Sequence, residues 1–465
     1  MTYSFETLYK LLFDAYFDAK AGQGLKKTAL DFEENEEKYI WDLAKDIYNR
    51  TYKPHPQTVF MIEDPICHTK REVFAPEFRD RIVSHFIFNL INPIFDPTFI
   101  YDSYSCRKGR GTSFGIDRFE HHVRSVSNNW KRQAYCLSLD VSGYFIHIDR
   151  KKLYKIVKNT LDSYRYKNLG LSIFSFKQFL YEVLGICLND VHNEITFIDI
   201  IDFDLIDYLL QTVLFRDPIK GVKRKSSRHK WRDYPEDKSM FNAPDGIGLT
   251  IGDVLSQLFS NIYLNCLDQF IKRELNAEHY GRYVDDAYIM SEDKAYLKDC
   301  IDKIEKFLSE TLGLHLSFKK VKISSTSGPL YFLGCKFLPF CRFLKHGTIA
   351  RFKNKIYEIE QVLETADPEL ITPDFLDYVC SSVNSYLGLF SRFKTYKLWT
   401  NVFQKVGPEF LKFFSPELVH DDPNQFDLLL QSTSNKSNKY TVRDRYKIVP
   451  NENNPEYNLY HYGIS

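Results

Sequence analysis

The chain has 465 residues, and its 44% hydrophobic and 16% aromatic content is enough to bury a large core. The formal net charge of +1 at pH 7 lacks the strong basic excess that many nucleic-acid binders carry. No apolar run is long enough to span a bilayer or to form a signal peptide, so we expect a cytoplasmic protein that inserts in no membrane.

The nine cysteines are scattered along the chain and include no C-x-x-C pair. This spacing argues against a disulfide framework and against a zinc site. We expect the cysteines to be buried thiols.

Helical spacing between about Phe5 and Arg50 predicts two helices. Their apolar stripes comprise Leu8, Leu11, Leu12, Ala15 and Tyr16 in the first helix, and Ile40, Leu43 and Ile47 in the second. Residues 51–64, TYKPHPQTVFMIED, break the helix with two prolines and then read as a strand. Residues 76–95 return to helical spacing up to Pro93, which predicts a mixed α+β lobe.

Residues 134–150, AYCLSLDVSGYFIHIDR, begin as a buried strand that ends at an acidic residue, turn at Ser142 and Gly143, and lead into a helix from about Lys151. Clean helical spacing follows in residues 251–275, and GRYVDDAYIM reads as a hairpin that turns at two aspartates. Strands are expected at VKISS and YFLGCKF, and helices at SSVNSYLGLFSRF and WTNVFQKV. The polar tail from Ser432 is expected to be loosely ordered.

A densely basic segment, RDPIKGVKRKSSRHKWR, runs from Arg216 to Arg232. Phosphate contact by such a patch would make binding strongly salt-dependent, whereas a solvated loop is the simpler interpretation of charge alone. The candidate RNA-binding residues are Lys223, Arg224, Lys225, Arg228 and Lys230.

Three aspartates stand at predicted strand ends that a long helical insertion separates: Asp140, Asp285 and Asp286. Two-metal phosphoryl transfer needs carboxylates that converge from different strands on two Mg²⁺ ions about 3.5–4 Å apart. An Asp-Asp pair in a turn is also simply good turn chemistry, so the pair alone does not decide between the two interpretations.

The sequence Tyr283-Val284-Asp285-Asp286, flanked by apolar strands, matches the Y-x-D-D box of reverse transcriptases, and the chain resembles that family from about Tyr39 to Phe393. The resemblance implies that the three aspartates are catalytic ligands of two Mg²⁺ ions, with Mn²⁺ able to substitute. LDVSGYF resembles the first palm motif, which implies that Phe145 lies under the sugar and selects deoxynucleotides, although a buried Phe after a strand is more often core.

Residues 248–268 resemble the second palm motif, in which Gly252 would let the backbone approach the templating base pair, with Ser256 and Gln257 beside the substrate. Many family members read Q-G-x-x-x-S-P here. The I-G-x-x-x-S-Q version in this chain is similar to bacterial diversity-generating retroelement enzymes and to defence-associated groups.

Other segments extend the resemblance. KREVFAPEFRDRIVSHFIF resembles the fingers segment that holds the triphosphate, with Lys70, Arg71 and Arg79 as candidates. SYSCRKGRGT has Cys106 where glycine is usual, and Arg107 is the candidate contact to template or nucleotide. Downstream, Lys320 is in register with the general-acid lysine, with Lys319 as the alternative, and YFLGCKF and SYLGLFSRF resemble the primer-grip hairpin and the first thumb helix.

The resemblance implies an α+β right-hand polymerase with fingers, a palm with an antiparallel sheet, a helical thumb and a C-terminal extension. The expected boundaries are 1–50 for an N-terminal helical extension, 51–130 for the fingers, 131–345 for the palm with a basic insertion at 216–232, 346–410 for the thumb and 411–465 for the tail.

The function expected from the resemblance is RNA-directed DNA polymerisation, a nucleotidyl transfer from dNTPs that copies an associated RNA, expected to be noncoding, into DNA for bacterial antiphage defence. Two alternatives stay open. One is a retroelement enzyme that makes adenine-mutagenised cDNA, and the other is a module that only binds structured RNA. Priming from a tail tyrosine, a homo-oligomer or an accessory protein are further possibilities that the sequence does not select.

Overall fold

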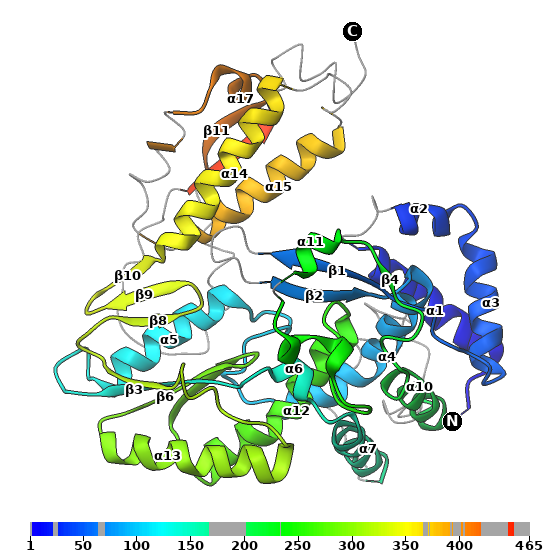
Figure 1. Ribbon diagram of the computed structural model, residues 1–465, viewed down its shortest axis with the longest axis horizontal. Helices are drawn as coiled ribbons and strands as arrows, with labels where there is room; N and C mark the ends of the chain where they lie inside the picture. Colours follow the sequence, from blue (N-terminus) through cyan, green and yellow to red (C-terminus); the bar gives the residue numbers. More distant parts are fainter. Residues whose placement is uncertain are drawn as a thin grey trace, which may run out of the picture. The chain divides into compact units, whose positions relative to one another are not determined.

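The computed structural model describes residues 2–21, 27–63, 70–166, 201–232, 234–365, 371, 373–390, 393, 401–402, 405–419 and 445–450 (Figure 1). Contacts divide the chain into two compact units. The first contains the described residues up to Gly328, and the second contains those from Pro329 onward. The domain boundaries expected from the sequence remain predictions.

The N-terminal segment forms α1 (Phe5–Lys20), α2 (Lys27–Glu33) and α3 (Glu36–Tyr48). Three helices stand where two were predicted, because the chain turns at residues 34–35. Ser4 caps α1 by accepting a hydrogen bond from the backbone N–H of Thr7. Both predicted apolar stripes are buried, and α1 packs against α3 and the following helix α4 (Phe78–Phe95).

The segment predicted as fingers contains a small sheet in the order β2-β1-β4. Strands β1 (Thr58–Glu63) and β2 (Lys70–Ala75) are antiparallel, and β4 (Lys223–Arg224) runs parallel to β1. The basic segment, which was assigned to the palm as an insertion, therefore contributes a strand to this sheet and the short helix α11 (Arg228–Trp231) next to it.

A four-stranded antiparallel sheet in the order β5-β6-β3-β7 forms the predicted palm. Its strands are β3 (Tyr135–Asp140), β5 (His279–Tyr283), β6 (Asp286–Ser291) and β7 (Lys322–Ser325). Helices α5 (Thr112–Val126) and α13 (Lys294–Phe307) lie on opposite sides of these strands (Figure 1). The predicted hairpin at the two aspartates is confirmed.

The other helices of the first unit include α12, which confirms the helix predicted after Gly252. They are α6 (Tyr144–His147), α7 (Arg150–Tyr166), α10 (Phe203–Leu214) and α12 (Val254–Arg273), with single turns η1 (Asp96–Thr98), η3 (Glu236–Lys238), η4 (Met240–Asn242) and the π-helical η5 (Leu308–Leu312).

The second unit begins with an antiparallel meander of β8 (Leu330–Phe332), β9 (Cys335–Leu338) and β10 (Cys341–Leu344). Helices α14 (His346–Thr365), α15 (Pro373–Phe390) and α17 (Pro408–Phe413) follow, and β11 (Phe414–Val419) pairs with β12 (Arg445–Pro450). Of WTNVFQKV, only residues 401, 402, 405 and 406 lie among those described.

Two predictions need correction. The tail was expected to be loosely ordered from Ser432, but residues 445–450 form β12, which pairs with β11 along its whole length. Cys106 is exposed, unlike Cys136, Cys300 and Cys335, which are buried as expected. Among the described helices, none is both long and apolar enough to cross a membrane.

Candidate active site

The ends of β3 and β6 bring two of the three predicted aspartates together. Asp140 is the last residue of β3 and Asp286 the first of β6, and they are directly paired across the antiparallel ladder. Side chains at such opposed positions share a face of the sheet, with Cβ atoms about 4.5–5.5 Å apart. Asp285 lies in the adjoining two-residue turn between Tyr283 and Asp286. The strand pairing and the turn therefore bring these three residues to the same edge of the sheet, where the charges of all three carboxylates act on Lys320.

Lys320 reaches this edge from the segment that precedes β7. Its Nζ donates a hydrogen bond to Asp140 Oδ1 at 2.7 Å. Partial burial disfavours the ammonium, but the hydrogen bond and the charge of Asp140 outweigh that effect and raise the pKa of Lys320 above its ordinary value. Lys320 is therefore protonated at neutral pH and lies against a buried carboxylate.

The electrostatics around Asp285 suit a bound cation. Burial and the negative charge of Asp140 both raise the pKa of Asp285, while Lys320 and Arg71 act in the opposite direction. Carboxylate oxygens are the ligands that hard divalent cations prefer, and a cation between these aspartates would relieve their repulsion. In the described part of the chain, no three His, Cys, Asp or Glu side chains already lie at metal-binding distance. The donor set fits Mg²⁺, with Lys320 as the present partner of Asp140.

The three predicted triphosphate contacts have different surroundings. Arg71 is exposed on β2 and lies close enough to Asp285 for its charge to lower the pKa of that carboxyl. Lys70 Nζ donates to the carbonyl oxygen of Arg232 at 2.7 Å, which ties β2 to the basic segment. Arg71 therefore acts electrostatically on Asp285, whereas Lys70 holds a backbone carbonyl of the basic segment.

Arg79 differs from its predicted role. Its guanidinium pairs with Asp46 of α3, lies 3.7 Å from Asp80 and stacks 5.1 Å from the centre of the Tyr52 ring. These contacts join α3 to α4, because the arginine follows the N-terminus of α4 and faces the N-terminal helices. We propose that Arg79 has a structural role, which leaves its predicted contact with a triphosphate to be tested.

Phe145 lies in α6, five residues after Asp140, and is partly buried against the core. Its carbonyl oxygen accepts a hydrogen bond of 2.8 Å from the backbone N–H of Leu249. This bond ties the first predicted palm motif to the start of the second. The placement is compatible with both core packing and sugar contact, so the selective role stays a prediction.

Gly252 is needed for an internal contact. Its φ is +127°, and a Cβ at this position would lie 2.7 Å from the carbonyl oxygen of Phe74. The backbone N–H of Phe74 in turn donates to the carbonyl of Ile251 at 2.8 Å. The close approach that excludes a side chain is thus to strand β2, whereas the sequence interpretation placed a templating base pair there.

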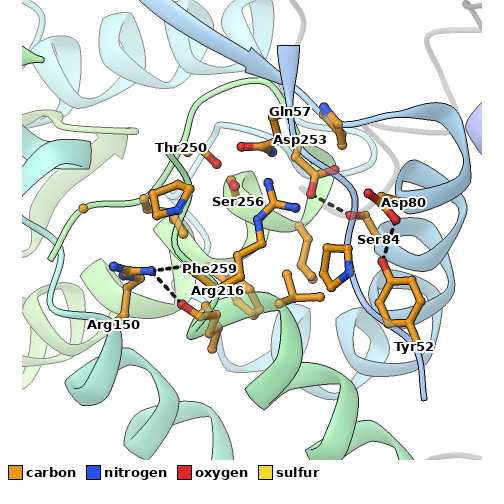
Figure 2. Close-up of a pocket in the computed structure, with 18 residues that line it drawn as sticks. Tyr52, Gln57, Asp80, Ser84, Arg150, Arg216, Thr250, Asp253, Ser256 and Phe259 are labelled. Carbon is orange, nitrogen blue, oxygen red and sulfur yellow. Dashed lines mark hydrogen bonds between the residues drawn. The ribbon is translucent and has the colours of Figure 1, made fainter. Parts of the chain in front are cut away.

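A pocket beside the N-terminus of α12 contains Ser256, whereas Gln257 is exposed on the same helix (Figure 2). Ser84 Oγ donates to Asp253 Oδ2 at 2.6 Å, and this bond joins α4 to the residue before α12. Figure 2 shows Arg216 directed into the pocket near Ser256. Buried Ser256 therefore faces the interior between the two helices, and the neighbouring Gln257 faces outward.

Arg107 was predicted to contact template or nucleotide, but its guanidinium is used internally. It donates to both carboxylate oxygens and the carbonyl of Asp96, and to the carbonyls of Ile100 and Ser103. Its side chain is only 8% exposed. The preceding Cys106 has φ +54°, a left-handed conformation that glycine adopts without steric cost.

The basic segment presents an exposed surface. Lys223 lies 3.7 Å from Glu77, and the Arg224 guanidinium lies 4.1 Å from the ring centre of Phe241 and 5.1 Å from that of Trp231. Lys225 and Lys230 are also exposed, whereas the side chain of Arg228 lies outside the described residues.

Sequence reasoning missed Arg282, which is fully buried beneath the turn that carries Asp285. The available signal was a charged residue at a position where the strand should face the core, one residue before the Y-x-D-D box.

The α+β fold, with an antiparallel sheet on which Asp140 and Asp286 are opposed, agrees with the predicted fold class. Residues 236–337 match the family model described as "Reverse transcriptase (RNA-dependent DNA polymerase)". This stretch is a reverse transcriptase domain, whose enzyme class is RNA-directed DNA polymerase, a nucleotidyltransferase.

A curated relative is the "Uncharacterized 91 kDa protein in cob intron" of Schizosaccharomyces pombe, which is 24% identical over 324 residues, or 67% of this chain. The chain spans 37% of that relative's length. Similar solved structures include telomerase from Candida albicans in complex with a telomeric RNA fragment, which is 11% identical with a TM-score of 0.39 over 81% of this chain and 60% of that one. Apo telomerase from Candida tropicalis is 12% identical with a TM-score of 0.44 over 76% of this chain and 59% of that one.

Proposed function

We propose that the chain is a reverse transcriptase that copies an RNA template into DNA, with Asp140, Asp285 and Asp286 as ligands of two Mg²⁺ ions. The observation that carries the proposal is the direct pairing of Asp140 with Asp286 beside the turn that holds Asp285. Mn²⁺ is expected to substitute, since it shares the preference for carboxylate oxygens.

When bound, the two cations would supply activation of a primer 3′-hydroxyl and stabilisation of the departing pyrophosphate. The protein's own groups have distinct tasks. Lys320 holds a proton beside Asp140, and we propose that it gives this proton to the leaving group. Arg71 supplies positive charge for the triphosphate, and Phe145 is proposed to exclude a 2′-hydroxyl.

We further propose that the template is a noncoding RNA bound in the cytoplasm, and that the DNA product serves bacterial antiphage defence. The exposed cations of the basic segment support RNA binding, because phosphates attract such cations. A retroelement role with adenine errors is the second candidate, and the I-G-x-x-x-S-Q motif favours it.

The test is to express the chain with its native flanking DNA, purify it and sequence the bound RNA and any DNA, for wild type and D285A. DNA complementary to one associated RNA, present only with wild type, is expected. Adenine-specific errors in that DNA would favour the retroelement role. Bound RNA without any Asp285-dependent DNA would contradict the polymerase and favour an RNA-binding module.

A further inference from the structure

The turn that carries Asp285 contains a residue in an unfavourable conformation. Val284 has φ +56°, a region that a β-branched residue rarely adopts. Both of its backbone polar groups are held by neighbours. Its N–H donates to Ser105 Oγ at 3.3 Å, and its carbonyl accepts from Arg282 Nη1 at 2.9 Å. The surrounding structure, and not the preference of valine, therefore fixes the peptide that leads into Asp285.

Arg282, which holds this carbonyl, is itself oriented by a bidentate pair with Asp268. Arg282 is 1% exposed, and its Nε and Nη2 donate to the two oxygens of fully buried Asp268 at 2.8 and 2.6 Å. The hydroxyl of Tyr280 also donates to Asp268 Oδ1, at 2.6 Å. Such a bidentate pair fixes the plane of the guanidinium, which aims Nη1 at Val284.

The remaining N–H groups of Arg282 also have partners. Nη1 donates to Asn261 Oδ1 and Nη2 to Ser103 Oγ, each at 3.4 Å. With the bonds to Asp268 and Val284, all five donors of the guanidinium are used. A lysine has a single nitrogen and no planar fork, so it cannot pair with Asp268 and hold the turn in the same way.

We propose that Arg282, oriented by Asp268, is a positioning residue that holds the Val284 carbonyl and thereby sets the position of the Asp285 carboxylate beside the Asp140–Asp286 pair. The kinetic part of this inference rests on the proposed function, whereas its cation-binding part does not. Removing the hold should let Val284 relax toward negative φ and displace the carboxylate that follows it.

The test compares R282K with the double variant R282K/V284G. Glycine adopts positive φ without steric cost, so it should keep the turn in place without the arginine. R118K is the matched control, because Arg118 makes a similar fork to Asp102, at 2.6 and 3.0 Å, but does not contact the turn. The readouts are the affinity for Mn²⁺ alone by calorimetry, kcat and KM for dNTP in primer extension, and the thermal midpoint.

We expect R282K to weaken Mn²⁺ binding and to lower kcat by about 10- to 100-fold, the usual effect of losing a residue that orients metal ligands, with KM for dNTP nearly unchanged. V284G should restore much of both losses in the R282K background, and R118K should lower only the thermal midpoint. The proposal would be overturned if R282K and R118K lost Mn²⁺ affinity and kcat equally, or if V284G restored neither quantity in the R282K background. A wild type that binds Mn²⁺ but does not polymerise would contradict the proposed function, while the Mn²⁺ comparison would still decide the role of Arg282.

Discussion

At the scale of single residues, position decides which charged side chains act in the site. Burial and the charge of Asp140 raise the pKa of Asp285, whereas Arg79 and Arg107 are paired with the carboxylates of Asp46 and Asp96.

Replacing Asp285 with asparagine should stabilise the metal-free protein. The pKa of Asp285 is raised in the folded state by burial and by the charge of Asp140. The proton-bound form is thus favoured in the fold, and stability without metal is highest below the ordinary pKa of Asp and falls as pH rises through the raised value. In EDTA at pH 7, D285N should melt a few degrees above wild type, and the gap should shrink below pH 4. A lower melting temperature for D285N at pH 7 would contradict the electrostatic account.

We expect replacement of Arg71 to affect substrate binding and replacement of Arg79 to affect stability. R71A removes a cation near Asp285 and should raise KM for dNTP about tenfold, equivalent to roughly 1.4 kcal/mol of lost binding. R79A should leave KM unchanged and cost about 1 kcal/mol of unfolding free energy, since it removes an ion pair and a ring contact. Steady-state kinetics and urea unfolding on both variants measure the contrast. A KM effect confined to R79A would reverse the assignments.

At the scale of elements, the contact between β2 and the loop before α12 joins the predicted fingers to the predicted palm. Gly252 permits this contact because it has no Cβ, and a Cβ at this position would clash with the Phe74 carbonyl oxygen. The Ser84 to Asp253 hydrogen bond then fixes the next residue against α4. The loop that precedes Gln257 is therefore positioned from the β2 side.

G252A should destabilise the protein by roughly 2 kcal/mol or more, since it combines positive φ with a clash against backbone. The matched control is G246A, because Gly246 also has positive φ, +75°, but a Cβ there has no heavy atom within 4 Å. The control should cost about 1 kcal/mol. If urea unfolding gave the same loss of unfolding free energy for G252A and G246A, backbone conformation alone, and not the close approach of β2, would require glycine at position 252.

At the scale of the whole molecule, sequence reasoning succeeded where the signals are local. The strands at Asp140 and at the Y-x-D-D box were predictable from apolar runs that end at turns, and their pairing follows once both strands join one sheet. The pairing of Arg79 with Asp46 and of Arg107 with Asp96 was not predictable. A guanidinium binds a carboxylate of the same chain as well as a phosphate, and only the packing of the helices decides which carboxylate lies within reach. The strand pairing of the basic segment with β1 is likewise a long-range contact without a local signal.

The basic segment should make nonspecific RNA binding salt-dependent. Replacing Lys223, Lys225 and Lys230 with glutamine should reduce the slope of log affinity against log salt by about 2, the value for three phosphate contacts on a single strand. The same change at Lys298, Lys303 and Lys306 of α13 is the control and should leave the slope unchanged. Equal slopes for wild type and the basic-segment variant in fluorescence titrations would rule out the segment as the RNA contact.

The central claim is that the aspartates at the ends of β3 and β6 catalyse RNA-templated DNA synthesis. The most direct measurement is extension of a labelled DNA primer on a defined RNA template with dNTPs and Mg²⁺, by wild type, D140A and D285A. The account predicts full-length, template-directed DNA with wild type and a rate lower by on the order of 10³-fold in each variant, equivalent to about 4 kcal/mol of lost transition-state stabilisation. Extension by D140A or D285A at the wild-type rate would contradict it.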